Sequence, residues 1–144
     1  MIDYGQITAA IKTILEARLD KTYLITRNEE RNVNPNLPLR KGKYINITRG
    51  SQSLAAYTLG NTPWLVTIKP KIELQVSSMI SGQDAEDKLQ DAEKAVMDVL
   101  TGNKKLNNTV AMTLGYDIEY EYNQNEQIYH HAAIITINAQ CRTG

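Results

Sequence analysis

The sequence contains few of the residues that build common chemical sites. Of its 144 residues, one is a cysteine, Cys141, and none is a phenylalanine. A single thiol cannot form an intramolecular disulfide or supply a cysteine-based zinc site. Lys and Arg together number 16, and so do Asp and Glu, so the formal net charge is zero. Because nucleic-acid binding requires clustered positive charge, this balance argues against a generally cationic nucleic-acid binder.

Long apolar runs and a secretion signal are missing as well. No apolar run approaches the ~20 residues of a membrane helix, and the N-terminal residues MIDYGQ lack the basic-then-apolar order of a signal peptide. We therefore expect the chain to fold in a reducing cytoplasm and to have no membrane partner. Its length predicts a single domain over residues 1–144. The eight tyrosines suit a surface that is wet at one stage and buried at another.

Two segments have the period of an amphipathic helix. The first begins at Asp3, a candidate N-cap, and its apolar stripe runs over Ile7–Leu15. The second covers Ser81–Leu100, with Ser81 as the candidate N-cap and Gly102 as the candidate stop. We interpret both stripes as faces that cover a core.

Five further segments predict strands, and the strands at 64–76, 109–123 and 128–141 are the longest. Shorter strands are expected at 22–27 and 44–49, and polar loops at 28–39 and 50–63. Pro70 lacks an amide donor, so its strand should lie at a sheet edge or bulge there. The predicted order is α-β-β-β-α-β-β, a two-layer α+β fold. In it, two helices pack on one face of a largely antiparallel sheet of about five strands, and the last two strands form a hairpin.

The three long strands are about twice the usual length, and two helices cannot shield all of such a sheet. We expect the tyrosine-rich end to dock on a neighbouring subunit; the alternative is that the hairpin projects harmlessly into solvent. The tyrosines concerned are Tyr116, Tyr120, Tyr122 and Tyr129. If the strands containing Lys69–Glu73 and Asp117–Glu121 pair, opposite charges could face each other; alternatively, this polar face lines a lumen or an interface.

Residues for catalysis or metal binding do not form a recognisable motif. His130 and His131 are adjacent on a strand, so their side chains should point to opposite faces and cannot chelate one metal. Cys141 lies ten residues from His131, too far for a nucleophile–base pair, and is expected to be a buried small hydrophobe. We therefore expect no enzyme activity, no metal and no cofactor.

The whole pattern resembles a known family. The resemblance rests on the segments GKYINITRGSQSL, DAEDKLQDAEKAVMDVL and HHAAIITINAQCR, with an amphipathic helix and a long polar loop before them. Together they resemble the tail terminator (tail completion) proteins of long-tailed bacteriophages. The resemblance implies a structural protein of the virion tail, at its neck end. It implies a homo-hexameric ring on the tail tube protein that stops tube polymerisation and joins the head-completion or connector protein.

The resemblance also implies interfaces on loops and strand ends, and DNA as passing cargo facing the basic segment 40–49. The interface candidates are Arg31, Arg40, Lys41, Lys43, Arg49, Tyr57, Trp64, Tyr116, Tyr120, Tyr122 and Tyr129. Three alternatives remain open: a head-closure or connector adaptor of the phage neck, a small-ligand enzyme on an α+β scaffold, and a nucleic-acid binder that uses segment 40–49.

Overall fold

The computed structural model describes residues 2–28, 43–55, 64–125 and 127–143, with the backbone alone at 53–55, 64–65, 125 and 142–143. Its elements follow the predicted order and are, in turn, α1 Tyr4–Arg18, β1 Tyr23–Arg27, β2 Lys43–Ala55, β3 Trp64–Ser78, α3 Gly82–Thr101, β4 Met112–Asn125 and β5 Ile128–Thr143. The predicted loop at 28–39 lies outside the described residues, apart from Asn28.

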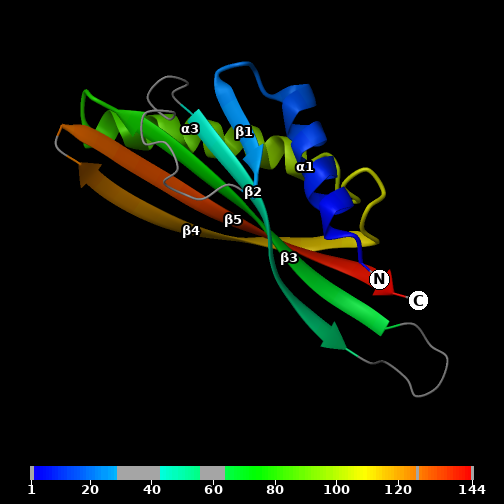
Figure 1. The fold of residues 1–144 in the computed structure, drawn as a ribbon. Coiled ribbons are helices and arrows are strands. Elements are labelled where there is room, and N and C mark those ends of the chain that lie inside the picture. Colours follow the sequence, from blue (N-terminus) through cyan, green and yellow to red (C-terminus); the bar gives the residue numbers. More distant parts are fainter. Residues whose placement is uncertain (1, 29–42, 56–63, 126, 144) are drawn as a thin grey trace.

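The strands form one sheet in the order β1-β2-β3-β5-β4 (Figure 1). β1 and β2 are parallel, and the other three neighbouring pairs are antiparallel. This arrangement confirms the α+β class and the largely antiparallel sheet. The strands β2 to β5 have 13 to 16 residues each, well above the usual ~5–6.

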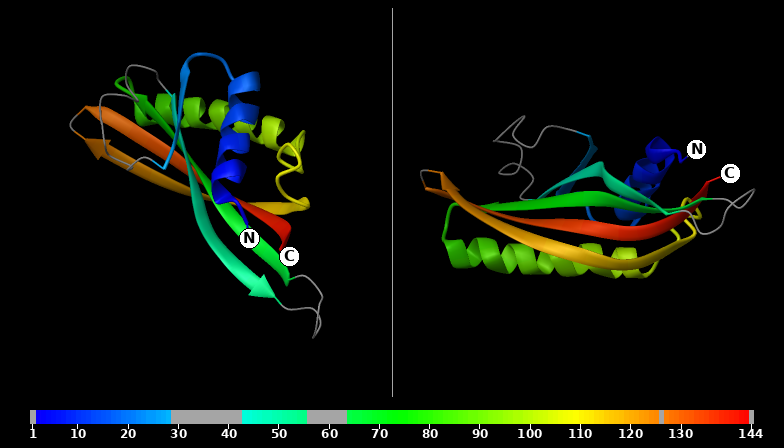
Figure 2. Two further views of the ribbon diagram at one scale, coloured as in Figure 1. Left: turned by 45° about the vertical axis from the view of Figure 1, so that its right-hand side comes forward. Right: turned by 90° about the horizontal axis from the view of Figure 1, so that it is seen from below.

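Both helices pack on the same face of the sheet, as the amphipathic stripes predict. α1 packs against β1 and β2, and α3 lies along β3 and β5 (Figure 2). The strands contribute the alternate residues of each run to this helix-side face. Its fully buried strand residues include Ile45, Ile47, Ile68, Ile72, Leu74, Ile135 and Ile137. The opposite face, which we call the open face, carries no helix of the described residues.

The helix ends confirm the capping predictions. The Asp3 side chain accepts a hydrogen bond from the Gln6 amide at 2.9 Å, and the Ser81 hydroxyl accepts one from the Asp84 amide at 3.0 Å. Each bond satisfies one of the amides that a helix N-terminus leaves without a partner. α3 ends at Gly102, as expected.

β2 is longer than predicted because Gly50 lets it continue. We expected a strand at 44–49 and a loop from residue 50, but β2 runs to Ala55. Gly50 has φ +66°, and the register with β3 shifts between Thr48 and Ser51. A glycine in this left-handed conformation forms a bulge, after which pairing resumes.

Pro70 lies in a central strand, so the prediction that its strand lies at an edge is wrong. The alternative, a bulge in its own strand, is also not what the structure has: the bulge lies opposite Pro70, in β2. β3 is between β2 and β5. Its neighbours Lys69 and Lys71 pair with Ser51 and Thr48 on either side of the β2 bulge. The bulge therefore falls opposite the one residue of β3 that cannot donate to the ladder.

β4 begins at Met112 rather than at residue 109, and a second bulge changes which residues share its face. The register with β5 shifts between Thr113 and Gly115. Strict alternation over the predicted strand 109–123 would place Met112 on the face of the tyrosines, but Met112 pairs with Gln140 and lies on the open face. The hairpin of β4 and β5 is confirmed, although β4 continues to Asn125, two residues beyond the predicted end at 123.

Candidate interaction surfaces

Most of the interface candidates in the two polar loops lie where the structure gives no description. Arg31, Arg40, Lys41 and Tyr57 are outside the described residues, and Trp64 has only its backbone described, as the first residue of β3. The structure therefore leaves their predicted roles as predictions.

The two described members of the basic segment lie at separate places on β2. The Lys43 ammonium lies 4.6 Å from the centre of the Tyr23 ring, and the Arg49 guanidinium lies 4.9 Å from the centre of the Tyr4 ring. Lys43 and Arg49 are six positions apart on the strand, so their Cα atoms are roughly 20 Å apart. Each cation contacts an aromatic face, so Lys43 and Arg49 do not form one basic patch.

The four hairpin tyrosines share the helix-side face, beside α3. Tyr116 and Tyr129 are half-buried, whereas Tyr120 and Tyr122 are exposed at 47% and 60%. The Tyr120 hydroxyl donates a 2.6 Å hydrogen bond to Glu93 Oε1 on α3. This hydrogen bond to a carboxylate raises the pKa of Tyr120 to about 12. α3 therefore supplies part of the cover that we expected from a neighbouring subunit.

A second contact joins the hairpin to α3 near its N-terminus. His131 Nδ1 lies 2.9 Å from Glu86 Oε2, and the Tyr122 ring meets the His131 ring edge-on, with centroids 4.5 Å apart. His130 points to the open face instead, where its Nδ1 lies 2.9 Å from Ser77 Oγ. Burial lowers the pKa of His130. The two histidines thus lie on opposite faces, as the strand period predicts.

The charged strands of the open face do not pair with each other, because β5 lies between them. Lys71 pairs with Thr136, which in turn pairs with Asp117. The predicted direct pairing of β3 charges with β4 charges is therefore wrong. Asp117 instead accepts a 2.9 Å hydrogen bond from Asn138 of β5. The open face is polar and bears both signs of charge.

Exposed apolar side chains occur at two places that sequence reasoning missed. Met79 and Ile80, in the turn between β3 and α3, are 68% and 79% exposed. Met112 and Leu114, at the start of β4, are 42% and 57% exposed. The composition of the turn between β3 and α3 could have revealed the first of these places, because short turns usually carry Gly, Asn, Asp or Ser rather than Met and Ile.

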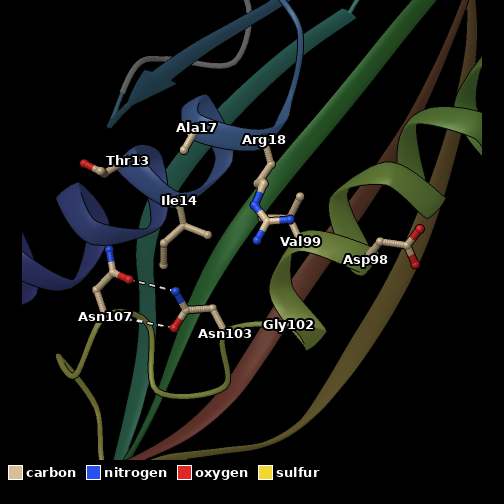
Figure 3. Close-up of a pocket in the computed structure, with 9 residues that line it drawn as sticks. All are labelled: Thr13, Ile14, Ala17, Arg18, Asp98, Val99, Gly102, Asn103 and Asn107. Atoms are coloured by element: carbon tan, nitrogen blue, oxygen red, sulfur yellow. Dashed lines mark hydrogen bonds between the residues drawn. The ribbon is translucent and has the colours of Figure 1, made fainter.

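One cavity, of about 190 Å³, lies between the C-terminal halves of the two helices (Figure 3). Arg18 and Asp98 are its ionisable lining residues. The side chains of Asn103 and Asn107 in its wall are hydrogen-bonded to each other at 2.7 Å. The lining therefore holds one carboxylate, that of Asp98, and no His, Cys or Lys side chain.

Metal ligands and a reactive thiol are not gathered elsewhere in the described part of the chain. Its residues contain no cluster of three or more His, Cys, Asp or Glu side chains that could hold a metal ion. Cys141 is buried in the core, as expected, and burial raises the pKa of its thiol. Among the helices described, none has the length and apolar character needed to cross a membrane.

No protein-family model matches the chain, and no curated protein matches it. Among solved structures, the chain is similar to a chain described as part of the virion of a native gene transfer agent particle. That match has a TM-score of 0.36 and 6% sequence identity, and it covers 95% of this chain and 91% of the other. What this chain does is therefore inferred from its own sequence, sheet and surface.

Proposed function

We propose that this chain is a structural subunit of a phage-type virion that acts as a tail terminator. In this role, copies form a ring on the last ring of the tail tube, stop tube polymerisation and offer the surface that joins the head connector. The sequence resemblance to tail terminators suggests the role. The observation that carries the proposal is a sheet of 13- to 16-residue strands with both helices on one face.

The open face has the character expected of a surface that meets other subunits or a solvent-filled lumen. It carries Lys71, Asp117 and Glu119 at exposed positions, and the described helices leave it uncovered. A sheet face of this kind remains soluble in a monomer and can become buried or line a lumen in an assembly. A ring also needs two different patches on each subunit, because contacts that close head to tail are heterologous.

An assembly role also agrees with the position of two hydrogen-bonded contacts between ionisable side chains. The His131–Glu86 and Tyr120–Glu93 contacts join the hairpin to α3 and lie outside the cavity of Figure 3. We therefore expect no catalysis and no cofactor. The partners we propose are further copies of this chain, the tail tube protein and the connector protein, with DNA as passing cargo.

Deletion of the gene tests the proposal. Tails assembled without the chain should vary in length or exceed the normal length, and they should fail to join heads. A plasmid copy of the wild-type gene should restore both properties, which controls for effects on neighbouring genes. Tails of normal length that join heads without the chain would refute the proposal. Normal length combined with failed joining would instead favour a connector adaptor.

A further inference from the structure

The turn that leads into α3 combines exposed apolar side chains with negative charge. We call residues 79–87 the Ile80 end. Met79 and Ile80 are among the most exposed large apolar side chains described, at 68% and 79%. The same nine residues contain three carboxylates and no Lys or Arg. Lys88, just beyond them, pairs with Asp84 at 3.3 Å, Glu86 contacts His131 at 2.9 Å, and Asp87 is exposed. This end is therefore apolar at its tip and acidic behind it.

The opposite end of α3 combines exposed apolar side chains with positive charge. We call residues 102–114 the Leu114 end. Met112 and Leu114 are both exposed: Met112 lies on the open face, and Leu114 is the extra residue of the β4 bulge. The Thr113 amide and hydroxyl both donate to the Lys104 carbonyl, at 2.9 and 2.7 Å, which holds the lysine turn against the start of β4. The segment contains two lysines and no Asp or Glu.

These two ends are separated by the length of α3. The helix has 20 residues, which corresponds to about 30 Å, and it lies along the sheet (Figure 2). One subunit therefore cannot bring its two ends together. Two Ile80 ends would repel each other through their carboxylates, and two Leu114 ends through their lysines, whereas unlike ends attract. Isolated exposed apolar residues are common, but paired ones at two complementary sites indicate contact surfaces.

We propose that the Ile80 end of one copy binds the Leu114 end of a second copy, so that copies of this chain associate head to tail along α3. Met79 and Ile80 then pack on Met112 and Leu114, and the lysine turn faces the carboxylates at the start of α3. Each bound pair leaves one free end of each kind, so further copies can add until the first and last copies bind each other and close a ring. The inference rests on the proposed function, because it names the surfaces that join the subunits of the ring.

Cysteine cross-linking tests this pairing directly in the full chain. The variants Ile80→Cys and Leu114→Cys, one with an affinity tag, are mixed at equal concentration and oxidised. The wild-type chain is the control, since Cys141 is buried. The 80–114 disulfide dimer should exceed each like-with-like dimer by about ten-fold. The statistical ratio of 1:2:1 for the 80–80, 80–114 and 114–114 dimers, or any smaller share of the 80–114 dimer, would overturn the proposal.

Surface variants then test the polarity of the contact. Ile80→Lys and Leu114→Glu each place a like charge opposite the partner end, so each variant alone should sediment as a monomer. Because each retains one intact end, and the introduced Lys and Glu have opposite charges, their mixture should associate again. Lys94→Glu, at an exposed position of α3 between the two ends, is the matched control and should associate as the wild type does. A Leu114→Glu variant that still self-associates would overturn the proposal, provided its circular dichroism matches the wild type.

Failure of this inference can be distinguished from failure of the proposed function. If the 80–114 dimer predominates but gene deletion leaves tails normal, the chain associates head to tail and is not a tail terminator. If deletion disturbs tail length but the three dimers form in the statistical 1:2:1 ratio, the chain acts on tails through another surface.

Discussion

Replacing Gly50 with alanine should destabilise the fold more than an ordinary strand substitution. Gly50 has φ +66°, and a Cβ placed on it would lie 1.8 Å from the carbonyl oxygen of Lys69. The left-handed conformation costs alanine about 1–2 kcal/mol. The backbone of β3 must also move to relieve the contact, and such movement disturbs the pairing of residues 51–55 with β3. We expect the free energy of unfolding to fall by about 3 kcal/mol or more.

Gly115→Ala is the matched control, since Gly115 also flanks a bulge in a long strand. A Cβ on Gly115 would have no atom within 4 Å, and its φ is not positive. Alanine there should be neutral, or stabilising by up to about 0.5–1 kcal/mol, because glycine is unfavourable within a strand. Urea unfolding followed by far-UV circular dichroism measures both variants. If the two midpoints differ by less than the equivalent of about 0.5 kcal/mol, the role assigned to Gly50 is refuted.

Three further predictions follow from the helix side of the sheet. Leu89→Ala should lower the free energy of unfolding by about 2–5 kcal/mol, since Leu89 is fully buried; a loss below about 1 kcal/mol in urea unfolding would contradict the packing described. Ser81→Ala should cost about 1 kcal/mol by removing the N-cap bond of α3, and Ser81→Asp, which keeps an acceptor, should restore most of it in the same assay. The Tyr120 pKa is raised, so the stability that its bond to Glu93 contributes is present below pH 10 and lost as pH rises through about 12. In an NMR titration, Glu93→Gln should return the Tyr120 midpoint towards 10, and an unchanged midpoint would show that another group causes the shift.

The helices were predictable because their signals are local. The Ser81 cap and the stripe that ends near Leu100 both concern residues that interact within one helix. The α3 bounds, Gly82–Thr101, therefore fall within one residue of the prediction. The alternation from residue 64 to 76 likewise reveals one long strand with one buried face, because a strand period of two depends only on burial.

Strand neighbours and bulges were not predictable in the same way. Alternation indicates which face of a strand is buried, but not which strand lies beside it, so the insertion of β5 between β3 and β4 could not be read from the charges. The bulges at Gly50 and at Leu114 depend on the register with a partner strand. The first made the predicted β2 too short, and the second reversed the predicted face of Met112.

The candidate surfaces were also predictable only where their signals are local in the sequence. The tyrosines of the hairpin were noticed because aromatic residues cluster in the sequence, but their contact with α3 depends on tertiary packing. Met79 and Ile80 were not singled out, because a strand-to-helix turn is polar in most proteins. Their exposure, and the lysine turn held beside Leu114, appear only once α3 is placed along the sheet.

The position of β5 also determines when the sheet can be completed during synthesis. β5 is the last of the five strands to leave the ribosome, yet it is the neighbour of both β3 and β4. Until it emerges, β4 lacks the strand with which it pairs, and one edge of β3 is bare. Pairs that join residues 64–78 to residues 129–143 are also distant in sequence, which slows folding. A nascent chain therefore carries a bare β3 edge from the synthesis of β3 until β5 emerges, and exposed strand edges of this kind make a folding chain prone to aggregation.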